Sequence, residues 1–237
     1  MLPALRRDIA ETRRWKAALK SLNQLRALGV VRRCLQGRWT CLKGYEVMRA
    51  AFAHAVSIVG HPALLVPVAV GLKTGASELS ATSTITVTGV SAVIALSALI
   101  YGLLQVRAGQ WQHPDASMQK ERLQLNVFLA FSLLSASIVL WSVRLPWQLA
   151  LGLAIAGAII VVALALRNLH KISLHSAFAV FSAFVLWPNI AGVSMLLLLA
   201  TLIAWSRLVL RRHTGMEVFL GLLVGVLAGG CLAVATA

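Results

Sequence analysis

Long apolar stretches alternate with short polar links along most of the chain. Each stretch is rich in Leu, Ala, Val, Ile and Gly, and seven are recognised, at 51–72, 84–106, 125–143, 148–166, 174–188, 190–206 and 216–236. A hydrocarbon core about 30 Å thick needs about 20 apolar helical residues to cross it. In lipid, only helices and closed barrels satisfy every backbone polar group, and these stretches lack the alternation of barrel strands. The pattern therefore predicts an all-α polytopic membrane helix bundle of six to seven spans, since the stretch 174–188 is short.

The composition agrees with this class of fold. Hydrophobic residues make up 59% of the 237 residues and charged residues only 12%. A soluble domain of this size contains a smaller fraction of apolar residues than this chain does. We therefore expect an integral membrane protein in which the apolar stretches of residues 50–237 form one membrane domain.

The net charge of +15 is concentrated in the amino-terminal segment, because 12 of the 22 Lys and Arg residues lie within residues 1–49. Apolar residues recur there at helical spacing between Leu19 and Leu42. This combination predicts a basic amphipathic arm that binds anionic lipid headgroups at the membrane surface. Binding of nucleic acid by such an arm is the alternative, and it is not expected.

The remaining basic residues indicate an orientation. If all seven stretches cross, eight of these residues lie on the side of the arm, and only Lys73 and Arg144 lie on the opposite side. Such a bias is the positive-inside pattern, and it places the links that follow the second, fourth and sixth stretches in the cytosol. If the first stretch, which contains Pro62 and Pro67, does not cross, the orientation of the rest is inverted.

These three links carry the residues with candidate chemistry. His213 and Glu217 are four residues apart and so share one helix face. A carboxylate beside an imidazole fixes its tautomer, which suits a nucleophile or an acid–base group. The planar guanidinium of Arg207 matches phosphate oxygens, and Ser173 and His175 open a helix whose free N–H groups favour an anion. We therefore expect the links to converge on one anion-binding pocket.

The last link resembles a sequence signature of the type 2 phosphatidic acid phosphatase superfamily. Ser206 and Arg207, five further residues, His213, three further residues and Glu217 resemble its third signature, in which Asp usually takes the place of Glu217. The resemblance extends over about residues 50–237.

The other two signatures are matched less fully. "KISLHSAF" at 171–178 resembles the second signature, usually Pro-Ser-Gly-His, with Ser173 and His175 in register. The first signature, Lys, six residues and Arg-Pro, is not matched, although Lys120 and Arg122 stand in its place.

The resemblance implies a phosphatase of the bacterial inner membrane that hydrolyses a lipid phosphomonoester or diphosphate, such as phosphatidic acid, phosphatidylglycerol phosphate or a polyprenyl diphosphate. His213 would form a phosphohistidine, Glu217 would orient it, and His175 would protonate the leaving oxygen. The phosphoryl oxygens would be bound by Arg207, Ser173 and one of Lys120 or Arg122. Lys171 has two open interpretations, a phosphate contact or a membrane anchor. The resemblance implies no metal ion and no cofactor.

Several alternatives remain from the sequence. We interpret His54, His61, His113 and His170 as packed or interfacial residues, and Arg211 and Arg212 as membrane anchors or topology signals. A lipid phosphotransferase or a non-catalytic member of the same fold would share the signatures. A transporter is less favoured, because its ionisable residues are expected in mid-helix. A haem protein would need paired His ligands on facing spans.

Overall fold

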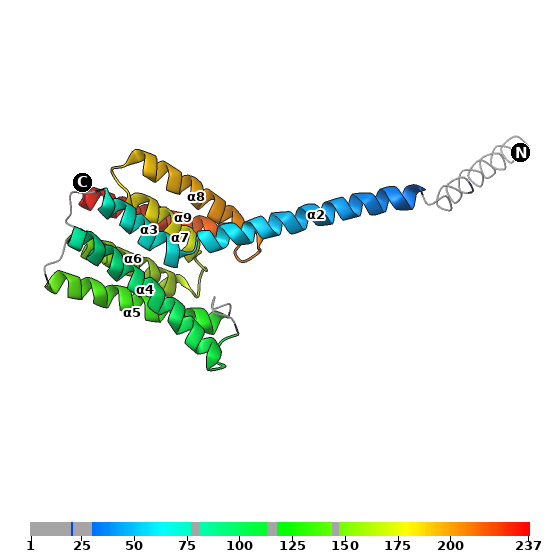
Figure 1. Cartoon of the computed structure of the whole chain (residues 1–237). Helices are drawn as coiled ribbons and strands as arrows, with labels where there is room; N and C mark the ends of the chain where they lie inside the picture. Colours follow the sequence, from blue (N-terminus) through cyan, green and yellow to red (C-terminus); the bar gives the residue numbers. More distant parts are fainter. Residues whose placement is uncertain (1–19, 21–29, 77–80, 113–117, 144–146) are drawn as a thin grey trace, which may run out of the picture. The chain divides into compact units, whose positions relative to one another are not determined.

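A computed structural model describes residues 20, 30–76, 81–112, 118–143 and 147–237, with residues 30–44, 82 and 83 described by their backbone alone. The contacts within the chain divide it between Ala51 and Phe52. The helices described below, apart from the first part of α2, belong to the second unit, Phe52–Ala237 (Figure 1). The side chains of the amphipathic segment predicted between Leu19 and Leu42, apart from Lys20, lie outside the described residues.

The described residues form helices and no strand, so the all-α prediction is confirmed. The helices are α2 (Val30–Val59), α3 (Pro62–Gly75), α4 (Ala81–Arg107), α5 (Gln119–Ser142), α6 (Trp147–Leu166), α7 (Leu174–Val185), α8 (Ile190–Val209) and α9 (Gly215–Ala235). Within the described residues, α4, α5, α6, α8 and α9 are each long and apolar enough to cross a membrane. The end of α2 and α3 together make a sixth candidate, bent by 52°. The chain is therefore an integral, multi-pass membrane protein.

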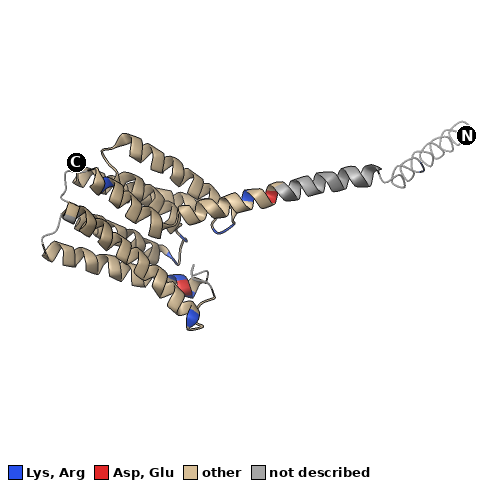
Figure 2. Cartoon of the chain, in the orientation of Figure 1, with Lys and Arg blue, Asp and Glu red and all other residues tan. Residues whose placement is uncertain are grey.

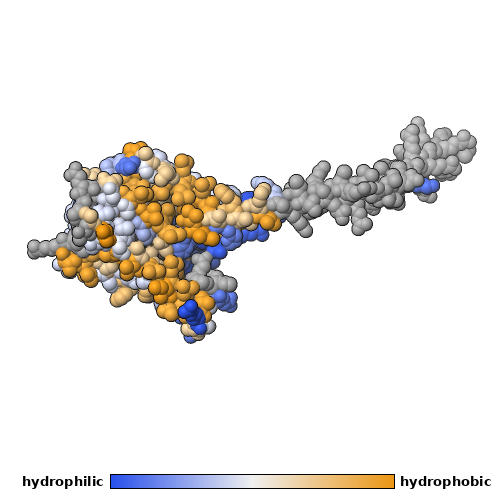
Figure 3. Space-filling model, viewed as in Figure 1, coloured by the Kyte–Doolittle hydropathy of each residue, from blue (hydrophilic) through white to orange (hydrophobic). Residues whose placement is uncertain are grey.

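Charge and exposed apolar surface agree with this placement in a membrane. The described Lys and Arg residues of the second unit lie at helix ends and in links, and the described helix bodies lack them (Figure 2). Large apolar side chains are exposed along the outer faces of the helices (Figure 3), among them Leu103, Phe131, Ile138, Leu198 and Leu227. Such a surface is stable where its solvent is hydrocarbon.

The first apolar stretch is broken at Gly60 and His61. His61 is the N-cap of α3, and its Nδ1 accepts a hydrogen bond from the backbone N–H of Ala63 at 3.2 Å. Pro62 occupies the first helical turn, where the missing N–H is not needed. A Cβ on Gly60 would lie 2.3 Å from the Ile203 side chain, so the absence of a side chain lets the bend approach α8. The bend brings His61 to the start of α3.

The short helix α7 lies among the other helices and contacts α3, α6, α8 and α9. Every residue from Ser176 to Ala183 is buried. Its 12 residues extend over about 18 Å, which is less than the thickness of the hydrocarbon core. The neighbouring helices therefore enclose α7 and fix its position.

Three glycines on α9 allow close packing against α7. Gly221, Gly225 and Gly229 are spaced by four residues and so share one face of α9. A Cβ on Gly221 would lie 2.5 Å from the carbonyl oxygen of Ser173, and a Cβ on Gly225 would lie 2.5 Å from that of Ala177. The two backbones thus meet directly, as at interfaces of small residues between membrane helices.

We expect Gly225→Ala to destabilise the protein by about 1–3 kcal/mol, because the added methyl group must displace the α7 backbone. Gly230→Ala is the matched control, since a Cβ at this position of α9 meets no atom within 4 Å. Thermal unfolding in detergent measures both. Equal unfolding temperatures for the two variants would contradict the close-packed interface.

Candidate functional site

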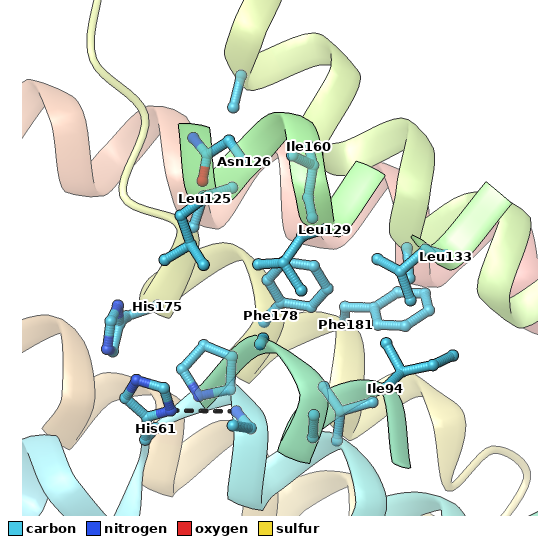
Figure 4. A pocket seen from close by; sticks show the side chains of 18 of the residues that line it. His61, Ile94, Leu125, Asn126, Leu129, Leu133, Ile160, His175, Phe178 and Phe181 are labelled. Carbon is cyan, nitrogen blue, oxygen red and sulfur yellow. Dashed lines mark hydrogen bonds between the residues drawn. The ribbon is translucent and has the colours of Figure 1, made fainter. Parts of the chain in front are cut away.

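A cavity of about 1190 Å³ lies between α3, α4, α5, α6 and α7 (Figure 4). One end, here called the cationic end, is lined by basic and imidazole side chains, namely Lys120, Arg122, Arg167, Lys171, Arg207, Arg212, His61, His175 and His213. Among the described residues that line the cavity none is acidic. The walls beyond this end are mainly Leu, Ile, Val, Ala and Phe. The cavity thus joins a site for an anion to a long apolar compartment.

His213 is oriented by Glu217 in the turn that begins α9. Its Nδ1 lies 2.8 Å from Oε2 of Glu217. Because an ionised carboxylate only accepts hydrogen bonds, Nδ1 carries the proton in the neutral ring and the lone pair is on Nε2. This is the tautomer that a nucleophilic imidazole requires.

A capping box fixes the carboxylate in turn. The Thr214 hydroxyl accepts a hydrogen bond from the backbone N–H of Glu217, and Oε2 of Glu217 accepts one from the backbone N–H of Thr214, both at 3.3 Å. A Glu at this helix position is long enough to reach back to the N-cap. Glu217 therefore both caps α9 and orients His213. This capping box is indicated in the sequence by a Thr followed three residues later by a Glu, at Thr214 and Glu217. The sequence analysis did not identify it.

The turn between α8 and α9 returns the chain to the cationic end. Arg211 has a left-handed φ of 52°, a conformation unusual for a residue with a side chain. The N–H of Arg212 donates to the carbonyl oxygen of Arg207 at 3.1 Å, and the N–H of Arg211 donates to that of Leu208 at 3.0 Å. These bonds form a Schellman-type end to α8. As a result Arg207, on α8, and His213, in the link between α8 and α9, line the same cavity.

Arg207 is buried, with 4% of its surface exposed. Its Nη1 donates a hydrogen bond to the Ser57 hydroxyl at 2.6 Å. Near this contact the ring of Phe52 lies 5.9 Å from that of Trp205, so residues 52–59 of α2 pack on the end of α8. Because a guanidinium out of water needs hydrogen-bonding partners, Ser57 fixes Arg207 while leaving it part of the cavity wall.

His175, in the first turn of α7, faces His61 in the cavity (Figure 4). The ring centroids are 5.1 Å apart and the rings are nearly perpendicular, at 87°. The sequence analysis interpreted His61 as a packed or interfacial residue, and the structure instead places it in the lining of the cationic end. The sequence indicated this only through Pro62, because a proline is common in the first turn of a helix and the residue before it is then the N-cap.

Ser173 is placed differently from the other predicted site residues. Its side chain is fully buried, and its hydroxyl lies 3.1 Å from that of Ser176. It does not belong to the cavity lining. Its backbone N–H donates to the carbonyl oxygen of Glu217 at 3.0 Å. In this structure Ser173 therefore joins the segment before α7 to the first turn of α9 and does not present its hydroxyl to the cavity.

The structure brings the other predicted site residues together. Lys120, Arg122, Lys171, His175, Arg207 and His213 all line the cationic end, and Glu217 adjoins it through His213. Arg212, interpreted from the sequence as an anchor or topology residue, lines it as well, and so do Arg167 and the amides of Asn126 and Asn168.

A buried carboxylate positions the start of α5. Glu121 is 5% exposed, and its two carboxylate oxygens accept hydrogen bonds from the backbone N–H groups of Gln112 and Met118, each at 2.9 Å. The indole N–H of Trp111 also donates to the side chain of Gln124 at 2.8 Å. These contacts hold the turn that carries Lys120 and Arg122.

Burial lowers the pKa of His213 below its ordinary value of 6.5. The hydrogen bond and the charge of Glu217 oppose this shift by raising the pKa, while the positive charges of Arg207 and Arg122 lower the pKa further. The balance is a lowered pKa, so the neutral imidazole predominates at neutral pH. His213 becomes protonated only as the pH falls through this lowered pKa.

Two substitutions should move the pKa of His213 in opposite directions. Glu217→Gln removes a negative charge and should lower the pKa, whereas Arg122→Gln removes a positive charge and should raise it. Magnetic resonance titration of histidine-labelled protein in detergent measures both without reference to any activity. A pKa that rises in Glu217→Gln would show that the carboxylate does not face the imidazole in solution.

Comparison of this chain with protein-family models, with curated proteins and with solved structures found no match. The interpretation of the site therefore depends on its geometry and on the sequence signatures. Within the described residues, no group of three or more His, Cys, Asp or Glu is placed to hold a metal ion.

Proposed function

We propose that this membrane protein is a phosphatase that hydrolyses a lipid phosphomonoester or diphosphate through a phosphohistidine on His213. The observation that carries the proposal is the His213–Glu217 pair at the cationic end of a cavity whose other walls are apolar. A lipid phosphate has an anionic headgroup and a hydrocarbon tail that match these two parts. The resemblance to the type 2 phosphatidic acid phosphatase superfamily supports the same activity, with the bacterial inner membrane as its location.

Substrate binding would use charge and shape together. The guanidinium of Arg207 offers several N–H donors in one plane, and Lys120, Arg122 and Lys171 add positive charge at the same end. Phosphoryl transfer spreads negative charge over the phosphoryl oxygens, so fixed cations stabilise its transition state. The cationic side chains supply this stabilisation without a metal ion.

In the first step, the Nε2 lone pair of His213 attacks phosphorus and the bond from phosphorus to the leaving oxygen breaks. Glu217 stabilises the positive charge that develops on the imidazole. His175 donates a proton to the leaving oxygen, so that a lipid alcohol, or a lipid monophosphate from a diphosphate, is released. The phosphoryl group remains on His213.

In the second step, water attacks the phosphohistidine. His175, now neutral, accepts a proton from this water, and the bond from phosphorus to Nε2 breaks. Inorganic phosphate is released and His213 returns to its initial state. The same imidazole thus serves as acid in the first step and as base in the second.

The geometry favours this proposal over the two other classes. A transporter would need polar or ionisable groups near the middle of the membrane, whereas here they gather at helix ends. A haem site on His54 and His61 is not favoured, because His54 is exposed on α2 and His61 caps α3 beside His175.

We expect phosphate release from a panel of lipid phosphates by the detergent-purified protein, with a chelator present throughout. His213→Ala should lower the rate by about three orders of magnitude or more, because the nucleophile is removed. His170→Ala is the matched control, since this exposed histidine of the α6–α7 link does not line the cavity.

A covalent intermediate is the second readout of the same experiment. Brief incubation with a substrate carrying a radioactive phosphoryl group should label the wild-type protein and not His213→Ala. Absence of phosphate release by folded protein would overturn the phosphatase proposal, and transfer of the label to an added alcohol without release would establish a phosphotransferase.

Arg207→Lys should lower kcat about a hundredfold although the positive charge is kept, because the planar set of donors is lost. Arg211→Lys is the control on the same turn, since Arg211 is exposed and does not line the cavity. Steady-state kinetics with the best substrate of the panel measures both. Equal losses in the two variants would contradict the phosphate-binding role of Arg207.

A further inference from the structure

The cavity extends along the whole length of α6. Gln148 lines it at the beginning of this helix and Arg167 lines it just beyond the end. The separation of 19 residues between these two positions corresponds to about 28 Å along a helix. The lining also follows α3 from its N-cap, His61, to Thr74. The cavity therefore reaches through nearly the full thickness of a hydrocarbon core of about 30 Å.

The two ends of the cavity differ in charge. Opposite the cationic end, the lining contains Lys73, Thr74, Gln148 and Thr236. The ammonium group of Lys73 donates a hydrogen bond to the carbonyl oxygen of Trp187, so it is held by the protein. An anionic headgroup is therefore attracted to the cationic end, where six Lys and Arg side chains line the cavity.

Between the two ends the walls are apolar apart from Ser91 of α4, whose hydroxyl donates to the carbonyl oxygen of Thr88. Leu129, Leu133, Ile160, Phe178 and Phe181 face the cavity from α5, α6 and α7 (Figure 4). A charged headgroup would lose its hydration there without gaining polar partners, which is costly. A hydrocarbon chain would meet walls of its own chemistry. The middle of the cavity therefore suits a stationary chain and not the passage of a headgroup.

The length of the cavity distinguishes between lipids. The chains of a lipid in one leaflet extend over about half of the core, or about 15 Å. They would occupy only half of a cavity that is about 28 Å deep. A longer chain would bury additional CH₂ groups, each of which strengthens binding about fourfold.

We infer that this cavity is a slot for a hydrocarbon chain longer than one leaflet, on a lipid whose phosphate headgroup binds at the cationic end. The inference rests on the proposed function and names its substrate class, a long-chain lipid phosphate. Among the substrates that the sequence resemblance implies, a polyprenyl diphosphate has such a chain, whereas the two glycerolipids have chains of leaflet length.

Gly152 offers a way to test the depth of the slot. It lines the cavity from α6, and a Cβ at this position meets no atom within 4 Å. It lies 15 residues from Arg167 along the chain, which corresponds to about 22 Å from the cationic end. A larger side chain here would block the far part of the slot and leave the first 15 Å or so open.

The experiment measures binding of alkyl phosphonates of increasing chain length to the full chain in detergent, by native mass spectrometry. Phosphonates are used because their carbon–phosphorus bond resists hydrolysis. In the wild type, affinity should continue to rise when the chain exceeds about 15 Å. Gly152→Phe should weaken binding of the long chains at least tenfold and leave the short chains unchanged. Gly89→Phe is the control, because this α4 glycine also has open space around it but does not line the cavity.

An affinity that stops rising at leaflet length in the wild type would overturn the inference, whether or not Gly152→Phe folds. So would long-chain alcohols that bind as tightly as the phosphonates, since the headgroup would then not be recognised. The phosphate-release assay tests the proposed function independently of this binding experiment, because length-dependent phosphonate binding can persist in a protein that releases no phosphate. Conversely, phosphate release that does not depend on chain length would contradict the inference of a long-chain slot but not the proposed phosphatase function.

Discussion

The close contact between the backbones of α7 and α9 determines where the rest of the site lies. Gly221 and Gly225 have no side chain to separate the helices, so the carbonyl oxygens of Ser173 and Ala177 approach α9 directly. This approach allows the N–H of Ser173 to donate to the carbonyl oxygen of Glu217. The segment that carries His175 is thereby fixed against the turn that carries His213. Two links separated by about 40 residues of chain thus form one site because α9 has glycine at the positions where it meets α7.

The same site concentrates positive charge where the dielectric constant is low. Six Lys and Arg side chains line the cationic end, and the carboxylate of Glu217 is already engaged by His213 and Thr214. Mutual repulsion among such cations disfavours the compact state. The scaffold offsets this cost through fixed contacts, which include the Ser57 hydroxyl on Arg207 and the carboxylate of Glu121 at the start of α5. A bound anion would remove much of the repulsion, so the charge arrangement favours occupancy by an anion.

The sequence predicted most of the fold, because apolar runs of membrane length have few alternatives to helices. It also predicted the gathering of the three links at one end and, from the spacing of four residues, the His213–Glu217 pair. The expected common helix face is not the reason for this pair, because His213 precedes the N-cap of α9 and Glu217 reaches back to it. It did not predict the place of His61, because the contact with His175 joins residues 114 positions apart and depends on the bend before α3. The burial of the Ser173 hydroxyl could not be predicted from the sequence either, since it follows from the helix packing around α7. The depth of the cavity is a property of several helices together and has no signature in any one of them.

One oxygen of Glu217 accepts hydrogen bonds from both the His213 ring and the backbone N–H of Thr214. The electronic state of the imidazole and the order of the first turn of α9 are therefore thermodynamically linked. When His213 gains positive charge, its Nδ1 proton draws more strongly on this oxygen and competes with the amide of Thr214. Hydrogen exchange at that single amide thus becomes a reporter of the imidazole, and events at Nε2 in the cavity are transmitted to the backbone at the membrane surface.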